Sequence, residues 1–458
     1  MMPDANAYHE MAGQRSRRAA ILRLACVLCL LLLVLCVAFG TYAVSLRREL
    51  NRELDLIEAA DEPITPDDLG ELYAPPIADQ DATELWVAAT QEFDRIRAGE
   101  FIAYGDRAYP SREGVWPDMS HAEQMVAKYR PALDQFYRAS ERGGAVRFPV
   151  DFSQGYSTLL EHGVPLNIAT IVLANEAALK AYQGDNAGSI RAIRAIFGIV
   201  RSFENEPVQI SQFVRLAHQG TAIRTIEALL PMLSLSDEEV LELRELMRQV
   251  DFGRALQISL LGERANAVDL LLSDDPRGTL GKDDDEPQPP PNGRRFARTR
   301  DLIFYLRRVR SLMGATHLSG ATRQAELILV ERELEGFFDS DAATTYPWSN
   351  FFLRNICTMI VHCLKCEAHA MTGDTALAAL LYRRETGRPP GQLQDLVPDY
   401  MPTVPLDPFD GGPLRFRADG QRFVVYSIGP DCADDGGAPF KNLDQPYDIE
   451  FRVSYEGD

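Results

Sequence analysis

Residues 424–437 read VVYSIGPDCADDGG, and residues 447–451 read YDIEF. Each segment contains a run of β-branched and aromatic residues, which is typical of a strand. The two strands flank an acidic, glycine-containing loop of roughly twenty residues, a length that is usual for functional or disordered loops. Four carboxylates gather where one strand ends and the next begins: Asp431, Asp434, Asp435 and Asp448. Because like charges repel, we expect a hard cation with oxygen ligands, Ca²⁺, among them. The alternative is a solvated acidic loop that is held by Asx-turns.

The residues around this loop complete a small β module. A long helix ends at Gly387, and two prolines that follow prevent its continuation. Residues 414–427 form two alternating runs that meet at Gly420, as in a β-hairpin. Residues 448–454 give a third run of the same kind. The sequence therefore predicts a small antiparallel sheet that follows a long helix.

This order of motifs resembles the C-terminal half of the major pseudopilin of type II secretion systems. That family has a long helix with the pattern A-L-x-x-Y-x-x-x-x-G-x-x-P, a P-x-D-P-[WF]-G turn and a small antiparallel sheet. Its Y-S-x-G-x-D … G-G … D-I loop binds Ca²⁺. The resemblance covers roughly the last 80 to 100 residues of the chain. The matching residues are Tyr382, Gly387, Pro389, Pro405, Asp407, Pro408, Phe409, Tyr426, Ser427, Gly429, Asp431, Gly436, Gly437, Asp448 and Ile449.

The resemblance also implies a set of calcium ligands. Asp431 and one carboxylate of the Asp434-Asp435 pair would be side-chain ligands, and the Ile428 carbonyl would be a backbone ligand. Asp448 would close the far side of the site. We therefore expect Ca²⁺ to stabilise the module.

The chain departs from the family in several places. Cys432 replaces the glycine that usually follows Asp431, and the loop is several residues longer. The N-terminus lacks the pilin signature, in which a glycine cleavage site precedes an apolar run that carries a glutamate. We therefore do not expect an ordinary pilus subunit.

Near the N-terminus, residues 24–44 contain no charged side chain. About twenty apolar residues match a hydrocarbon core of ~30 Å, so we expect a single transmembrane helix after a cytoplasmic tail at residues 1–23. Four arginines precede this segment and three follow it. We expect the C-terminal part to lie outside the cytoplasm, at a bacterial inner (cytoplasmic) membrane. The alternative is a signal peptide that is cleaved after Ala43, although the long apolar run favours retention.

Between the membrane segment and the module, the sequence predicts helices. Residues 45–81 read as a juxtamembrane helix and a proline-containing linker, and residues 82–349 read as a helical domain. An exposed loop is predicted at residues 274–293, and its acidic block precedes seven arginines within residues 294–310. We expect these opposite charges to neutralise each other locally. The last region, residues 350–458, holds the long helix and the β module.

Local signals mark where these helices begin and end. Gly184, Asp185 and Asn186 separate two helices, and the capping-box pattern from Ser236 to Glu239 opens another. Because the breaks are short, consecutive helices pack antiparallel, as in a bundle or solenoid. The predicted fold is mainly α, with a small C-terminal antiparallel β module.

Composition limits the function. The 458 residues are 46% hydrophobic and 25% charged, which is ordinary for a folded protein. The net charge of −20 argues against a nucleic-acid partner, because phosphate binding needs a basic face. No familiar catalytic motif is present, so we expect a membrane-anchored extracytoplasmic interaction or scaffold protein rather than an enzyme, with a role related to secretion or the envelope. The alternative is an envelope hydrolase that uses carboxylates of the helical domain such as Glu263.

One helix carries several side chains that can bind metals. Cys357, His362, Cys363, Cys366 and His369 lie within thirteen consecutive residues. Such a face could bind a transition metal. The apolar residues between them instead favour a buried core helix, because cysteine is a common small core residue.

Overall fold

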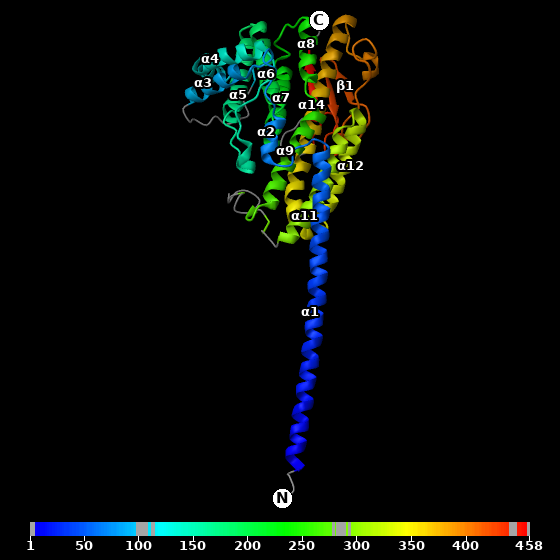
Figure 1. Cartoon of the computed structure of the whole chain (residues 1–458). Helices are drawn as coiled ribbons and strands as arrows, with labels where there is room; N and C mark the ends of the chain where they lie inside the picture. Colours follow the sequence, from blue (N-terminus) through cyan, green and yellow to red (C-terminus); the bar gives the residue numbers. More distant parts are fainter. Residues whose placement is uncertain are drawn as a thin grey trace.

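The computed structural model describes residues 5–97, 109–110, 115–276, 280, 290–291, 295–438 and 447–455, with side chains from Arg23 onward. The described chain is mainly helical and ends in one small antiparallel sheet, which confirms the predicted fold class (Figure 1). The acidic block of the predicted loop 274–293 lies outside the described residues.

The first helix, α1 (Ala5–Ala59), is 55 residues long and projects far beyond the rest of the molecule (Figure 1). Its segment Arg23–Ala59 is long and apolar enough to cross a membrane, and the most apolar part of that segment has no buried side chain. Leu24 is 62% exposed and Leu35 is 64% exposed. This segment has the properties of a membrane anchor or of a signal sequence.

The last turns of α1 belong to the folded body. Leu46, Leu50 and Ile57 are buried where α1 packs on α11 (Arg295–Thr316). The carboxylate of Glu53 is also buried there, and both Arg307 and Arg310 of α11 donate hydrogen bonds to it. Within the described residues, these two arginines therefore pair with α1, and the acidic block of the preceding loop lies outside those residues.

The first half of the body is an array of helices that pack mainly on their neighbours in the chain. The predicted separation at residues 184–186 is confirmed, since Asp185 caps the helix that follows it by accepting a hydrogen bond from Gly188 N. The capping box at Ser236 is confirmed as well, with Ser236 and Glu239 bonding each other's backbone amides. The elements are α2 (Pro66–Leu72), α3 (Thr83–Arg97), α4 (Met119–Arg142), η1 (Phe152–Ser157), α5 (Gly163–Tyr182), α6 (Asn186–Ser202), α7 (Gln209–Leu229), α8 (Asp237–Arg248) and α9 (Phe252–Leu272).

The second half is organised around a 40-residue helix, α14 (Pro347–Thr386), which packs on α7, α8, α9, α11 and the sheet. Helices α12 (Gly320–Phe338) and α13 (Asp341–Thr345) precede it and pack against it. The buried carboxylate of Asp301 on α11 accepts hydrogen bonds from the backbone amides of Trp348 and Ser349, each at 2.9 Å. A side chain from a neighbouring helix thus satisfies amides that the first turn of a helix leaves unpaired.

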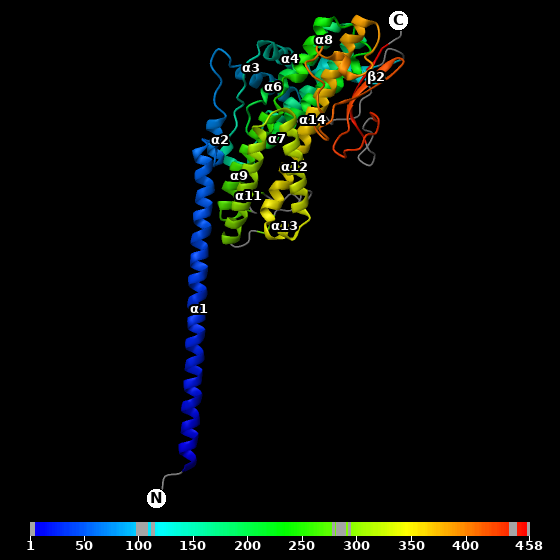
Figure 2. The same cartoon turned by 90° about the vertical axis from the view of Figure 1, so that its right-hand side faces the viewer.

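The sheet has the order β1-β2-β3, with β1 (Arg415–Asp419), β2 (Arg422–Ser427) and β3 (Ile449–Ser454) antiparallel to one another. Helix α14 ends at Gly387, whose φ of 75° is readily adopted by glycine, and the short 3-10 helix η2 (Leu393–Leu396) leads toward the sheet. Buried Val425 and Phe451 lie opposite each other on β2 and β3, which pack on α14. Figure 2 places this module at the end of the body away from the N-terminus of α1.

Candidate functional site

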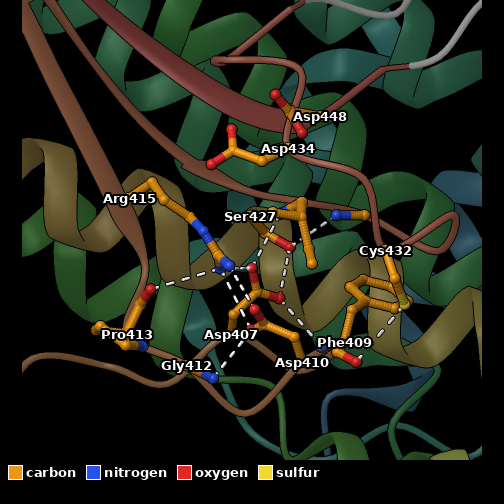
Figure 3. Close-up of polar contacts among 12 residues, drawn as sticks. Asp407, Phe409, Asp410, Gly412, Pro413, Arg415, Ser427, Cys432, Asp434 and Asp448 are labelled. Atoms are coloured by element: carbon orange, nitrogen blue, oxygen red, sulfur yellow. Dashed lines mark hydrogen bonds and ion pairs between the residues drawn. The ribbon is translucent and has the colours of Figure 1, made fainter.

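Asp407 is the buried centre of the C-terminal module. Its carboxylate is 0% exposed and lies in the segment that precedes β1 (Figure 3). Oδ1 accepts hydrogen bonds from Phe409 N at 3.0 Å and Ser427 Oγ at 2.8 Å, and Oδ2 accepts them from Ile428 N at 2.9 Å and Arg415 Nη1 at 2.6 Å. A buried carboxylate needs such complete pairing. Asp407 therefore joins the turn, β1 and the end of β2.

Arg415, at the start of β1, links this buried centre to the surface. Its guanidinium donates to Asp407 and also to Asp410, which is about one third exposed. The hydrogen bond from Arg415 lowers the pKa of Asp410, so this carboxylate stays ionised beside the arginine. Sequence reasoning identified Asp407 only as part of a turn motif. The buried ion pair was missed, because it depends on folding Arg415 and Ser427 back onto the turn.

Asp448, just before β3, closes the acidic loop from the inside. It is 1% exposed and accepts hydrogen bonds from Gly437 N at 2.6 Å, Ala438 N at 3.3 Å and Asp435 N at 3.4 Å. Burial raises the pKa of this carboxyl, while the three amide hydrogen bonds oppose that change. Asp448 therefore holds the loop through its backbone.

The other three predicted carboxylates, Asp431, Asp434 and Asp435, are exposed. Asp431 accepts a hydrogen bond from Ala433 N at 3.2 Å, and Asp434 accepts one from Gly436 N at 3.0 Å. These short-range bonds are Asx-turns, the arrangement expected of a solvated acidic loop. Figure 3 shows that the Asp434 and Asp448 side chains lie on the same side of the module, away from Asp407.

The backbone at the start of the loop makes one departure from the pseudopilin pattern conformationally unfavourable. Cys432 has a φ of 55°, in the left-handed region that side chains disfavour. The family has glycine at this position, which adopts that conformation without strain. Ile428, the predicted backbone ligand, is 4% exposed and donates its amide to Asp407.

The carboxylates of the loop do not form a compact cage in the described chain. Among the residues that the structure describes, Asp431, Asp434, Asp435 and Asp448 do not provide three ligand atoms that all lie within 4.8 Å of one another. Both oxygens of Asp448 already accept backbone hydrogen bonds. Residues 439–446 of the loop lie outside the described residues. The described arrangement therefore does not fit a bound ion as it stands, and the calcium site stays a prediction.

Glu263 of α9, the residue on which the hydrolase alternative rested, is 5% exposed. Its carboxylate accepts a hydrogen bond from the Tyr156 hydroxyl at 2.9 Å, and burial raises its pKa to about 7. The neighbouring Arg264 pairs instead with Glu62 at 2.6 Å. A pKa near 7 suits a general acid or base. An enclosed carboxylate that faces a tyrosine nevertheless gives the hydrolase alternative no support.

The cysteine and histidine side chains of α14 lie mostly inside the body. Cys357 is 6% exposed and Cys363 is 2% exposed. Burial raises the pKa of the Cys363 thiol and lowers the pKa of His369 to about 3. The Sγ atom of Cys366 lies 3.8 Å from Nε2 of His362. Because most of these side chains are buried, they support the interpretation of this part of α14 as a core helix.

Searches of protein-family models, curated proteins and solved structures gave no match to this chain. The resemblance to pseudopilins therefore depends on the C-terminal motifs alone.

Proposed function

We propose that the chain is a single-pass membrane protein whose helical body holds a pseudopilin-like module away from the bilayer, where the module binds an envelope partner. The membrane would be the bacterial inner membrane, with the body outside the cytoplasm. The observation that carries this proposal is the continuity of α1, which joins an exposed apolar segment to a buried contact with α11. In water, so many exposed leucines would be unfavourable, whereas lipid would cover them.

Retention of the apolar segment is also supported by local structure. Residues 41–43, the candidate cleavage site, are helical, and the Thr41 hydroxyl donates to Ala38 O within the same helix. Three residues later, Leu46 is buried in the body. The candidate cleavage site thus lies in a regular helix directly beside a folded contact. We therefore favour an anchor over a cleaved signal peptide.

The module offers a charged surface for the partner. Asp431, Asp434 and Asp435 are exposed, and the module that carries them lies beyond the apolar part of α1, on the body (Figure 2). Such a surface attracts cations, so the partner should present a basic face or share a Ca²⁺ ion with the loop. The Ca²⁺ ligands would be those implied by the resemblance, and Asp448 would have to exchange amide hydrogen bonds for the ion.

Site-specific crosslinking in cells tests the docking role. A photocrosslinking residue placed at Asp434 should give one discrete adduct with an envelope protein, and added basic peptide should compete with it in membranes. The same residue placed at Glu141, on the exposed end of α4, is the control and should not give that adduct. Equal adducts from both positions, or none from Asp434, would contradict docking through the acidic loop.

A further inference from the structure

Two glutamates of α12 and one cysteine of α14 converge on one point. Glu331 and Glu335 are four residues apart on α12, so their side chains lie on the same helix face. One carboxylate oxygen from each glutamate and the Sγ atom of Cys357 all lie within 4.8 Å of one another. Within the described part of the chain, this is the one group of three or more Asp, Glu, His or Cys residues that meets this distance.

The three groups have no better partners nearby. In the ranges that the structure describes, neither glutamate carboxylate has a hydrogen bond or an ion pair, and the Cys357 thiol is 6% exposed and equally unpartnered. Arg354, which lines the same cavity, donates from Nε to Asn350 at 3.1 Å, and its guanidinium lies 4.4 Å from the centroid of the Phe338 ring. Two close carboxylates repel each other, and the Sγ atom of the buried thiol lies within 4.8 Å of an oxygen of each.

These side chains line a cavity of about 370 Å³ between α12 and α14. His362 lines the same cavity, but its ring stacks on Phe213 with the centroids 4.9 Å apart, and its Nε2 faces Cys366. His362 is therefore not directed at the carboxylates. The cluster has three ligating side chains from two helices and an open side toward the cavity.

We propose that Glu331, Glu335 and Cys357 bind one divalent transition-metal ion, of which Zn²⁺ is the best match, with an open coordination position toward the cavity. A thiolate ligand disfavours Ca²⁺ and Mg²⁺, which prefer oxygen alone, whereas Zn²⁺ accepts both sulfur and carboxylate oxygen. The Cys357 thiol loses its proton to solvent when the metal–sulfur bond forms. Three protein ligands and a water molecule would complete a tetrahedral site. This site is separate from the acidic loop and does not depend on the proposed docking function.

The test uses the purified full-length chain in detergent, stripped of metal and then titrated with Co²⁺ and with Zn²⁺. Co²⁺ is the spectroscopic probe, because a thiolate ligand gives it a charge-transfer band in the near ultraviolet. We expect one ion per chain, a band that is absent in C357S, and an affinity for either metal that falls by about tenfold or more in E331Q and E335Q. The matched controls are E326Q, an exposed glutamate of the same helix, and C432S, an exposed cysteine of the module. Both should bind metal like the wild type.

Three outcomes would overturn the site: no metal binding by the wild type, an unchanged charge-transfer band in C357S, or binding that is lost in D434N but kept in E335Q. Circular dichroism shows whether each variant is folded. If C357S does not fold, metal titration of E335Q tests the site, because Glu335 is exposed and its replacement leaves the core intact. Wild-type affinity in E335Q would then overturn the site.

Discussion

Arg307 of α11 donates from Nε to the carboxylate of Glu53 on α1 across 2.8 Å, although 254 residues separate them in sequence. Glu53 is 4% exposed and also accepts a hydrogen bond from Arg310. This contact fixes the apolar helix to the body. Without it, α1 would be attached to the body through the buried side chains of Leu46, Leu50 and Ile57 and through the exposed ion pair of Glu49 with Arg307 at 3.1 Å.

We expect E53Q to lower the free energy of unfolding by about 1–2 kcal/mol, because it removes charge-assisted hydrogen bonds from a buried position. Urea denaturation of the full-length chain in detergent measures the change. E58Q is the matched control, since Glu58 is exposed and lies five residues further along the same helix. Equal stability of the two variants would show that the ion pair does not hold α1.

The Asp407 network makes a second prediction about stability. D407A should cost about 3–5 kcal/mol, because it leaves part of the charge of Arg415 and the amide of Ile428 without a partner. D410N removes the more exposed of the two partners of Arg415 and should cost less than about 1 kcal/mol. Thermal and urea unfolding of both variants measure the difference, and similar losses would contradict the central role of Asp407.

The buried carboxyl group of Glu263 should make the stability of the fold fall as the pH rises. Burial raises its folded-state pKa from 4.5 to about 7, so the folded chain binds more protons than the unfolded chain between these values. The contribution of this group to stability therefore falls as the pH rises from about 4.5 through 7. Above pH 7 the free energy of unfolding carries the full penalty for holding an ionised carboxylate in a buried position. For the shift from 4.5 to about 7, the penalty is roughly 3 kcal/mol.

Replacement of Glu263 by glutamine tests this dependence. E263Q keeps an oxygen for the Tyr156 hydroxyl and removes the ionisation, so it should lose less stability than the wild type between pH 5 and pH 8. Urea denaturation at several pH values gives both curves. Parallel curves for the two proteins would mean that Glu263 does not titrate in this range.

Calcium binding by the acidic loop is a separate prediction. Ca²⁺ should release or absorb heat in calorimetric titration of the wild type and should raise its melting temperature, because an ion that binds only the folded chain stabilises it. D431N/D434N should lose both effects, whereas D419N, which alters an exposed carboxylate paired with Arg422, should keep them. E335Q should also respond like the wild type, which separates this site from the proposed transition-metal site. If the wild type gave no heat and no change in melting temperature with Ca²⁺, the loop would be a solvated acidic loop without a calcium site.

Local signals in the sequence predicted much of the fold. The capping box at Ser236 and the helix end at Gly387 each depend on a few neighbouring residues, so they can be found without tertiary information. The strand pairing around Gly420 is predictable for the same reason, since a tight turn fixes the register.

The contacts that define the candidate sites are long-range, and the sequence did not reveal them. Arg307 follows an acidic block but pairs with Glu53, which precedes it by 254 residues. Cys357 was considered together with the histidines of its own helix, whereas its nearest ligand-type neighbours, Glu331 and Glu335, come from α12. Which faces of two helices meet is decided by packing, and a single sequence does not encode it in any local pattern.

The most direct test of the central claim is the intact mass of the chain that remains in bacterial inner membranes after washing at high pH. We predict that the chain in the membrane pellet still contains residues 24–44, with its C-terminal module open to protease added outside the cytoplasm. A soluble form that begins at Val44, or a module protected from external protease, would contradict the anchored arrangement.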